Sequence, residues 1–115
     1  MANTFKVVTK AGVTSADVIY TVAGSTTTVI LGLMLGNTTS SSINATVTLG
    51  SDTANRAGAN NEANQAVELI TATPIPGNSS LELLSGNKVV METTDTISVT
   101  GTAATDVVLS IMEIT

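Results

Sequence analysis

Apolar and polar residues alternate with a period of two through much of this chain. The clearest case runs from Ile43 to Leu49, where Ile, Ala, Val and Leu take every second position and Asn and Thr lie between them. Successive side chains of a β-strand point to opposite faces of the sheet, so this segment predicts a strand with one face in a core and one in water. The same alternation recurs at 96–99 and 107–114.

Turn-forming residues divide the chain into short runs of this kind. In the last third the breaks read Pro-Ile-Pro-Gly-Asn, Ser-Gly-Asn, Thr-Thr-Asp and Gly-Thr-Ala-Ala-Thr-Asp, and such residues tolerate or pre-set turn dihedral angles. Successive antiparallel strands are expected near Phe5 and Val7 and at 17–22, 26–35, 43–49, 67–71, 81–84, 88–91, 96–99 and 107–114. The fold class predicted is all-β: one antiparallel two-sheet β-sandwich domain over residues 1–115, immunoglobulin-like or jelly-roll in topology.

Apolar residues occupy both faces of the segment 26–35, which is typical of a central strand or of a strand that lies under a neighbouring subunit; we expect the central strand of the sandwich. Gly32 interrupts it, and a glycine inside a strand often marks a bulge or a close backbone approach. The alternation places Ile30 and Met34 on the face opposite the core. The predicted core residues are Val29, Leu31, Leu33, Val47, Leu69, Leu83, Ile97, Val99, Val107, Leu109 and Ile111.

Two aromatic residues, Phe5 and Tyr20, are present. Tyr20 is expected to share the inner face of its strand with Val18 and Val22, with its hydroxyl satisfied at the edge of the core. Phe5 has two interpretations: it closes one end of the core, or it belongs to an arm that packs on an adjacent subunit. The first strand is expected to end in a turn at Ala11-Gly12, and Pro74 and Pro76 predict a sheet edge or a corner between sheets.

Composition narrows the function classes. Histidine and cysteine are absent, which excludes disulfides, Cys or His metal ligands and nucleophiles activated by histidine. Four basic residues and a net charge of −5 argue against nucleic acid as a partner. Charged residues make up 11% of the chain and hydrophobic residues 43%, whereas a soluble domain is about 25% charged. This balance predicts a homo-oligomer or a repeated subunit whose apolar surface is covered by neighbours.

The longest polar segment runs from Gly50 to Gln65. It is predicted to be a loop, or to contain a short helix around 62–66, and together with the first strand it is the candidate for subunit contacts. Asp52 and Glu62 lie in it, but their spacing does not follow the calcium-loop pattern, so no metal site is predicted.

No signal peptide and no apolar run long enough for a membrane helix are recognised, so no membrane partner is expected. Asn37, Asn44 and Asn78 begin Asn-x-Ser/Thr tripeptides. Without a secretory route, these matches to the glycosylation pattern are interpreted as chance in a chain rich in Ser, Thr and Asn.

The carboxylates are scattered singly, so no catalytic, cofactor-binding or metal-ligating residues are predicted and the protein is expected not to be an enzyme. Two alternatives have clear structural requirements. An enzyme would need a cleft that gathers two of Glu68, Glu82, Glu92 and Asp95. A carbohydrate-binding module would need exposed aromatic side chains in a groove.

The segments VILGLMLGNTTSSSINATVTL and ITATPIPGNSSLELLSGNKVVMETTDTISVTGTAATDVVLSIMEI resemble small virion structural proteins of tailed bacteriophages. The resemblance covers about 26–114 and is interrupted by the polar insertion from Gly50 to Gln65. It implies a virion component made in the bacterial cytoplasm: first a capsid decoration protein bound to the major capsid protein, and alternatively a tail, neck or fibre-attachment component. It implies no catalytic residues and no cofactor.

Overall fold

The computed structural model describes residues 2–51, 65–84 and 86–115. Within these residues the chain forms strands and no helix, which confirms the all-β prediction. The strands of this described part are β1 (Asn3–Val13), β2 (Asp17–Thr21), β3 (Thr27–Asn37), β4 (Ile43–Ser51), β5 (Gln65–Ile75), β6 (Ser80–Leu83), β7 (Val89–Met91), β8 (Thr96–Gly101) and β9 (Thr105–Ile114).

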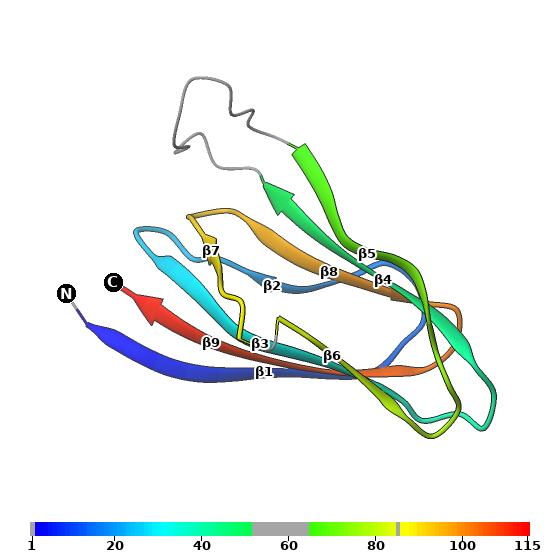
Figure 1. Cartoon of the computed structure of the whole chain (residues 1–115). Coiled ribbons are helices and arrows are strands. Elements are labelled where there is room, and N and C mark those ends of the chain that lie inside the picture. The colour runs from blue at the N-terminus through cyan, green and yellow to red at the C-terminus, as the bar shows by residue number, and fades with distance from the viewer. Residues whose placement is uncertain (1, 52–64, 85) are drawn as a thin grey trace.

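These strands form two antiparallel sheets that pack face to face (Figure 1). The five-stranded sheet has the order β1-β9-β3-β6, and β7 pairs with β3 beside β6. The four-stranded sheet has the order β2-β8-β4-β5. The predicted two-sheet β-sandwich is therefore confirmed.

The strand pairs are nested along the chain. β1 pairs with β9, β2 with β8, β3 with β6 and β7, and β4 with β5. This pairing of the first strand with the last, and inward from there, is that of a jelly roll. The immunoglobulin-like alternative is therefore not adopted. At the ends, Ala2 and Thr115 exchange two main-chain hydrogen bonds of 3.0 and 2.9 Å.

The core lies between the sheets and takes residues from both. Predicted core residues that are buried are Leu33, Val47, Ile97, Val99, Val107, Leu109 and Ile111. Leu69 and Leu83 are half-buried and pack against this cluster. The core residues outside the predicted set are Val13, Ile19, Val22, Ile30, Leu35, Ile43, Ala45, Ile75 and Met91.

The prediction for the central strand was right in position and wrong in facing. β3 lies between β9 on one side and β6 and β7 on the other. Its register against β9 shifts between Ile30 and Gly32, so the bulge suggested by Gly32 is present. A one-residue shift exchanges the two faces of a strand. Ile30 is therefore buried, whereas Val29 and Leu31 lie on the opposite face and leave the predicted core.

Bulges explain two further corrections. The register of β2 shifts between Val18 and Tyr20, which turns Ile19 into the core and leaves Val18 51% exposed. β1 does not turn at Ala11-Gly12 but continues to Val13, with Gly12 at φ +68° where the register against β9 shifts. A residue without a Cβ adopts that dihedral angle at no steric cost.

The remaining expectations concern connections. Pro74 lies in β5, the edge strand of its sheet, and β6 then begins in the other sheet, so the prediction of an edge and a corner is confirmed. Residues 50, 51, 65 and 66 belong to the β4–β5 ladder. The rest of the predicted loop or short helix, with Asp52 and Glu62, lies outside the described residues.

Candidate functional site

The outer face of the five-stranded sheet carries an apolar row across four strands. Phe5 of β1 pairs with Met112 of β9, Met112 pairs with Val29 of β3, and Val29 pairs with Val90 of β7. Residues paired across antiparallel strands share one face of the sheet. Their sequence neighbours, such as Ile30, are buried between the sheets, so this row points away from the core. Phe5 is 71% exposed and Val90 62%.

Two further rows follow along the same strands. Val7 pairs with Ser110, which pairs with Gly32. The next row contains Thr9, Val108, Met34 and Glu82. Glu82 is the one charged residue in these three rows. We call these rows, together with the bulge residue Leu31, the apolar face: its apolar members are Phe5, Val7, Val29, Leu31, Met34, Val90, Val108 and Met112.

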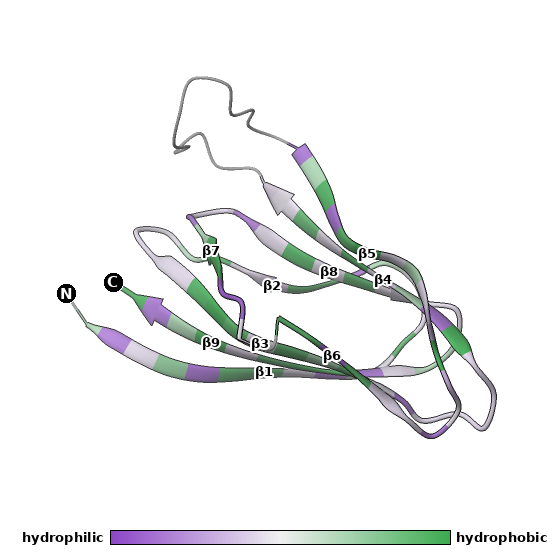
Figure 2. Ribbon diagram, viewed as in Figure 1, coloured by the Kyte–Doolittle hydropathy of each residue, from purple (hydrophilic) through white to green (hydrophobic). Residues whose placement is uncertain are grey.

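The outer face of the four-stranded sheet has a different chemistry. Ser98 pairs with Val18 and with Thr48, and Thr48 pairs with Glu68. Hydroxyl side chains on this face come from Thr21, Thr46, Thr48, Thr96, Ser98 and Thr100. One sheet therefore presents hydroxyl groups to its surroundings and the other presents hydrocarbon. Figure 2 shows β3, which contributes to the hydrocarbon-rich face, in green over much of its length.

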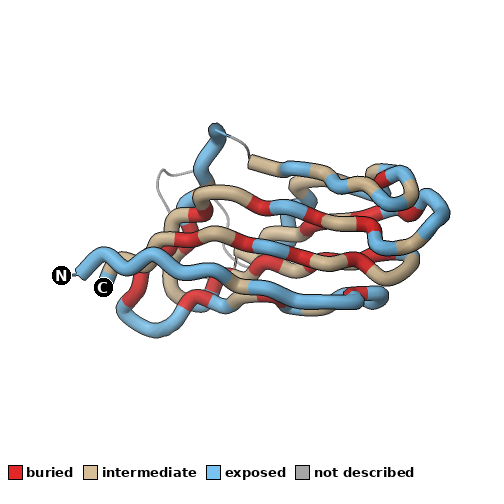
Figure 3. The backbone as a smooth tube through the Cα atoms, turned by 90° about the horizontal axis from the view of Figure 1, so that it is seen from below, coloured by how far each residue is buried: buried red, intermediate tan, exposed pale blue. Residues whose placement is uncertain are grey.

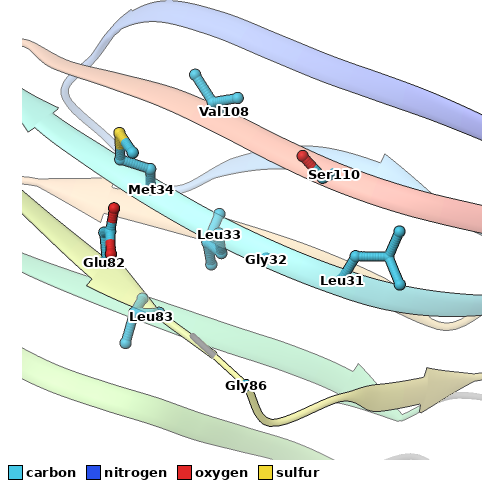
Figure 4. A pocket seen from close by; sticks show the side chains of 9 residues that line it. All are labelled: Leu31, Gly32, Leu33, Met34, Glu82, Leu83, Gly86, Val108 and Ser110. Atoms are coloured by element: carbon cyan, nitrogen blue, oxygen red, sulfur yellow. The ribbon is translucent and has the colours of Figure 1, made fainter.

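A cavity of about 270 Å³ opens in the apolar face. β6 pairs with β3 at 33–36 and β7 pairs with it at 28–30, so among the described residues no strand pairs with Leu31 and Gly32 on that side. Between β6 and β7, Leu84 and Gly86 have positive φ angles. The residues that line the cavity are Leu31, Gly32, Leu33, Met34, Glu82, Leu83, Gly86, Val108 and Ser110 (Figure 4).

Gly32 accounts for the shape of the cavity. It has no side chain at a position that faces outward between Leu31 and Met34. A Cβ placed there meets no atom within 4 Å, and its φ angle is not in the left-handed region. The space directly above Gly32 is therefore a consequence of residue choice and not of a strained backbone at that residue.

A polar network joins the two sheets near the start of β3 and the end of β9. The Tyr20 hydroxyl donates to Glu113 Oε2 at 2.6 Å and lies 2.7 Å from Thr28 Oγ1. Lys6 Nζ lies 2.7 Å from Glu113 Oε1. Burial, followed by the hydrogen bond to Glu113, raises the pKa of Tyr20 to about 12. Hydrogen bonds from Lys6 and then Tyr20 lower the pKa of Glu113. Tyr20 thus has the satisfied hydroxyl that was predicted.

The structure places the four candidate carboxylates at three separate locations. Glu68 lies on the hydroxyl-rich face and accepts a hydrogen bond from Thr71. Glu82 lies at the cavity. Glu92 and Asp95 come together in the turn after β7, where the Glu92 amide donates to Asp95 Oδ2 at 3.0 Å and Asp95 is 2% exposed. Asp95 therefore holds a turn, and the cavity contains a single carboxylate.

The aromatic residues and the metal candidates are also placed. Phe5 does not close the core, as the first interpretation had it, and it does not line the cavity. No group of three or more Asp or Glu residues capable of holding a metal occurs among the residues described. In the same part of the chain, no helix long and apolar enough to cross a membrane is found.

Asn37, the first residue of a glycosylation tripeptide, is 3% exposed. Its Nδ2 donates to the main-chain oxygens of Ser41, Ile75 and Pro76 at 2.8, 2.9 and 3.1 Å. Its Oδ1 accepts hydrogen bonds from the amide and hydroxyl of Thr39. The amide is a buried structural group, in line with the interpretation of this tripeptide as chance.

Comparison with known proteins finds little. No family model matches the chain, and no curated protein is significantly similar. One solved structure is similar in fold, with 17% sequence identity, a TM-score of 0.49, and coverage of 99% of this chain and 87% of the other. It is described as Bacillus endospore appendages that form a novel family of disulfide-linked pili.

Sequence reasoning missed the apolar face, although a signal for it exists. In 107–114 the outward positions include Val108 and Met112 as well as Ser110. Phe5 and Val7 likewise occupy alternate positions of the first strand. Each run is short, and their common face becomes visible only when β1, β9 and β3 are placed side by side.

Proposed function

We propose that this protein is a non-enzymatic structural subunit that is incorporated into a larger assembly through its apolar face. The observation that carries the proposal is the difference between the two outer faces of the sandwich. A free monomer gains nothing from Phe5, Val7 and Val90 at 71, 63 and 62% exposure on one sheet. Contiguous exposed apolar patches are typical of protein interaction surfaces.

The assembly we propose is the virion of a tailed bacteriophage, with the protein as a capsid decoration or cement subunit. The support is the resemblance of two long sequence segments to such proteins, together with the jelly-roll sandwich and the apolar face. Its role is mechanical: it buries apolar surface across joints between major capsid subunits, so that the particle resists internal pressure. A tail, neck or fibre-attachment component is the alternative within the virion.

Two measurements test this proposal. Quantitative mass spectrometry of purified virions gives the copy number: hundreds of copies that track the major capsid protein support decoration. A few dozen copies or fewer favour the tail or vertex, and absence from virions contradicts the virion proposal.

The second measurement tests the face itself. Val108→Asp places a charge on the apolar face, and Val18→Asp makes the same change on the opposite sheet, where Val18 is 51% exposed. Purified variants are added back to particles that lack the protein. Val108→Asp is expected to lose binding while Val18→Asp keeps it. Equal binding by both variants would show that the apolar face is not the contact surface.

A further inference from the structure

Phe5 is the feature of the apolar face that a monomer explains least. It is the single phenylalanine of the chain, and its side chain is 71% exposed on β1, the edge strand of the sheet. Figure 3, seen from below, shows β1 exposed along almost its whole length. Buried aromatic side chains supply more contact area than any other residue type, and they dominate binding energies when they insert into a pocket.

The same face contains a recess of suitable character. The cavity at Gly32 holds about 270 Å³ and is lined by hydrocarbon from Leu31, Met34 and Val108, with Glu82 at one side. Phe5 lies on the strand two places away from β3, on the order of 10 Å across the sheet. A projecting ring and an apolar recess therefore lie on one surface, too far apart to meet within one molecule.

We infer that the apolar face pairs with the apolar face of a second copy, so that Phe5 of each copy fills the cavity at Gly32 of the other. This inference rests on the proposed function and names the direct partner of the apolar face: a second copy covers the face in place of the capsid protein, and the dimer is the unit that enters the assembly. We call the Phe5 side chain the knob. A two-fold axis that lies in the plane of the interface, midway between this knob and the cavity, exchanges the positions of knob and cavity. The contact is then isologous and closes as a dimer.

The residues between knob and cavity favour this pairing. Near the midpoint lie Val7, Ser110 and Met112. In the dimer, each of them faces the same residue of the second copy or a residue next to it. A charge at such a position would meet the same charge across the axis, and these three residues have none. The apolar face is therefore compatible with itself.

The sheet that carries the apolar face is large enough for a stable contact. The molecule is 44 Å long in its longest extent, along which the strands run, and 23 Å in its shortest (Figure 3). The outer face of the whole sheet, of which the apolar face is a part, therefore exceeds the roughly 800 Å² that each partner contributes to a standard stable interface.

The test measures association by sedimentation equilibrium over a range of concentrations up to about millimolar. Wild type is expected to form dimers and no larger species. Phe5→Ala removes the knob, and Gly32→Val fills the cavity from within, where a Cβ meets no atom within 4 Å. Each variant is expected to raise the dimer dissociation constant at least about tenfold.

Matched controls separate this effect from general damage. Val18→Ala shortens an exposed apolar side chain on the opposite sheet, and Gly24→Val adds the same bulk at a turn where a Cβ also meets no atom within 4 Å. Both are expected to dimerise like wild type. The melting temperatures of Phe5→Ala and Gly32→Val are expected to lie no more than a few degrees below that of wild type. Such values would show that both variants fold.

Mixing the two variants gives the decisive result. A heterodimer of Phe5→Ala with Gly32→Val retains one intact knob and one open cavity, which neither homodimer has. The mixture is therefore expected to associate more tightly than either variant alone. No gain on mixing, or dimers of both single variants at wild-type strength, overturns the inference.

The outcome is distinguishable from failure of the proposed function. Monomers that bind purified particles through Val108 contradict the second copy as partner and leave the structural role in place. Dimers that bind no particle support the pairing and contradict the place in the virion. Stepwise formation of larger species by wild type would indicate a head-to-tail contact instead of the isologous one, and it would overturn the inference.

Discussion

At the scale of single residues, the network around Tyr20 provides a spectroscopic probe of the sandwich. The chain has one tyrosine and no tryptophan, so the ultraviolet absorbance of phenolate reports Tyr20 alone. The hydroxyl is held by Glu113 and Thr28, which lie on β9 and β3 of the opposite sheet. An intact network therefore means that the two sheets are docked at this end.

We expect the absorbance titration of the folded protein to have its midpoint near the pKa of about 12. Since the ordinary pKa of tyrosine is 10.0, the folded protein retains this proton where the unfolded chain loses it. The stabilisation is fully present below pH 10 and is lost as pH rises from there through about 12.

Glu113→Gln is the matched variant for this titration. Its amide removes the negative charge that raises the pKa of Tyr20, so the midpoint is expected to move down toward the ordinary value. A midpoint at 10 in the folded wild type would show that the hydroxyl is not held by Glu113.

Asn37 is a second residue whose role is set by its surroundings. Asn37→Asp replaces the amide nitrogen, which donates to three main-chain oxygens, by a carboxylate oxygen that repels them. We expect a loss of at least about 2 kcal/mol in the free energy of unfolding, because buried acceptors lose their donor and a charge is buried. Urea denaturation followed by circular dichroism measures it.

Asn78→Asp is the control, since it makes the same chemical change in an exposed turn. Aspartate tolerates the positive φ of 54° there nearly as well as asparagine. Its effect is expected within about 0.5 kcal/mol. Equal losses for both substitutions would mean that the hydrogen bonds of Asn37, which link the end of β3 to residues 75 and 76, do not stabilise the fold.

At the scale of elements, the bulge in β3 decides which side chains support the core. Ile30 is fully buried, whereas Leu31 is half-buried on the outer face. Ile30→Ala is expected to cost about 2–5 kcal/mol of unfolding free energy through the cavity that it leaves. Leu31→Ala is expected to cost about 1 kcal/mol or less, as a surface substitution.

Chemical denaturation of the two variants gives the comparison directly. If Leu31→Ala proved the more damaging, β3 would continue without the register shift between Ile30 and Gly32. The alternation would then place Leu31 inside, as the sequence pattern alone suggests.

β1 shows how an element can be regular and yet contribute little to the core. It is an edge strand of eleven residues, of which Val13 is the buried one. Its main-chain pairing with β9 and the ion pairs of Lys6 and Lys10 hold it in place. The Lys10–Asp17 pair is exposed on both sides, and such pairs stabilise by little. The value of β1 to the molecule therefore lies in the face that it completes.

At the scale of the whole molecule, a net charge of −5 and an apolar face with Glu82 as its one charge lead to a prediction about salt. We expect the dimer dissociation constant to change less than about twofold between roughly 0.05 and 0.5 M sodium chloride, because screening acts on charges and not on apolar contacts. Sulfate at equal ionic strength is expected to tighten the dimer. A steep weakening with sodium chloride would indicate a contact made by charged groups.

The sequence by itself determined the class of fold. Period-two alternation and regularly spaced turn residues predicted an antiparallel sandwich in one domain, and the structure confirms its strands and most of its predicted core. Lack of His and Cys also limited the chemistry of any site. These properties are local, because strand geometry and turn dihedral angles depend on a few neighbouring residues.

Only the tertiary structure decided which side chains face the core next to the bulges of β2 and β3. Alternation predicted the buried set in β4, β8 and β9, but one-residue bulges at Leu31 and Ile19 reversed the predicted facing of Val29, Ile30 and Val18. The apolar face and its cavity also depend on partners distant in sequence: Phe5, Met112, Val29 and Val90 form one row because nested pairing brings four strands together. Such rows are a property of sheet order and register, which no single segment contains.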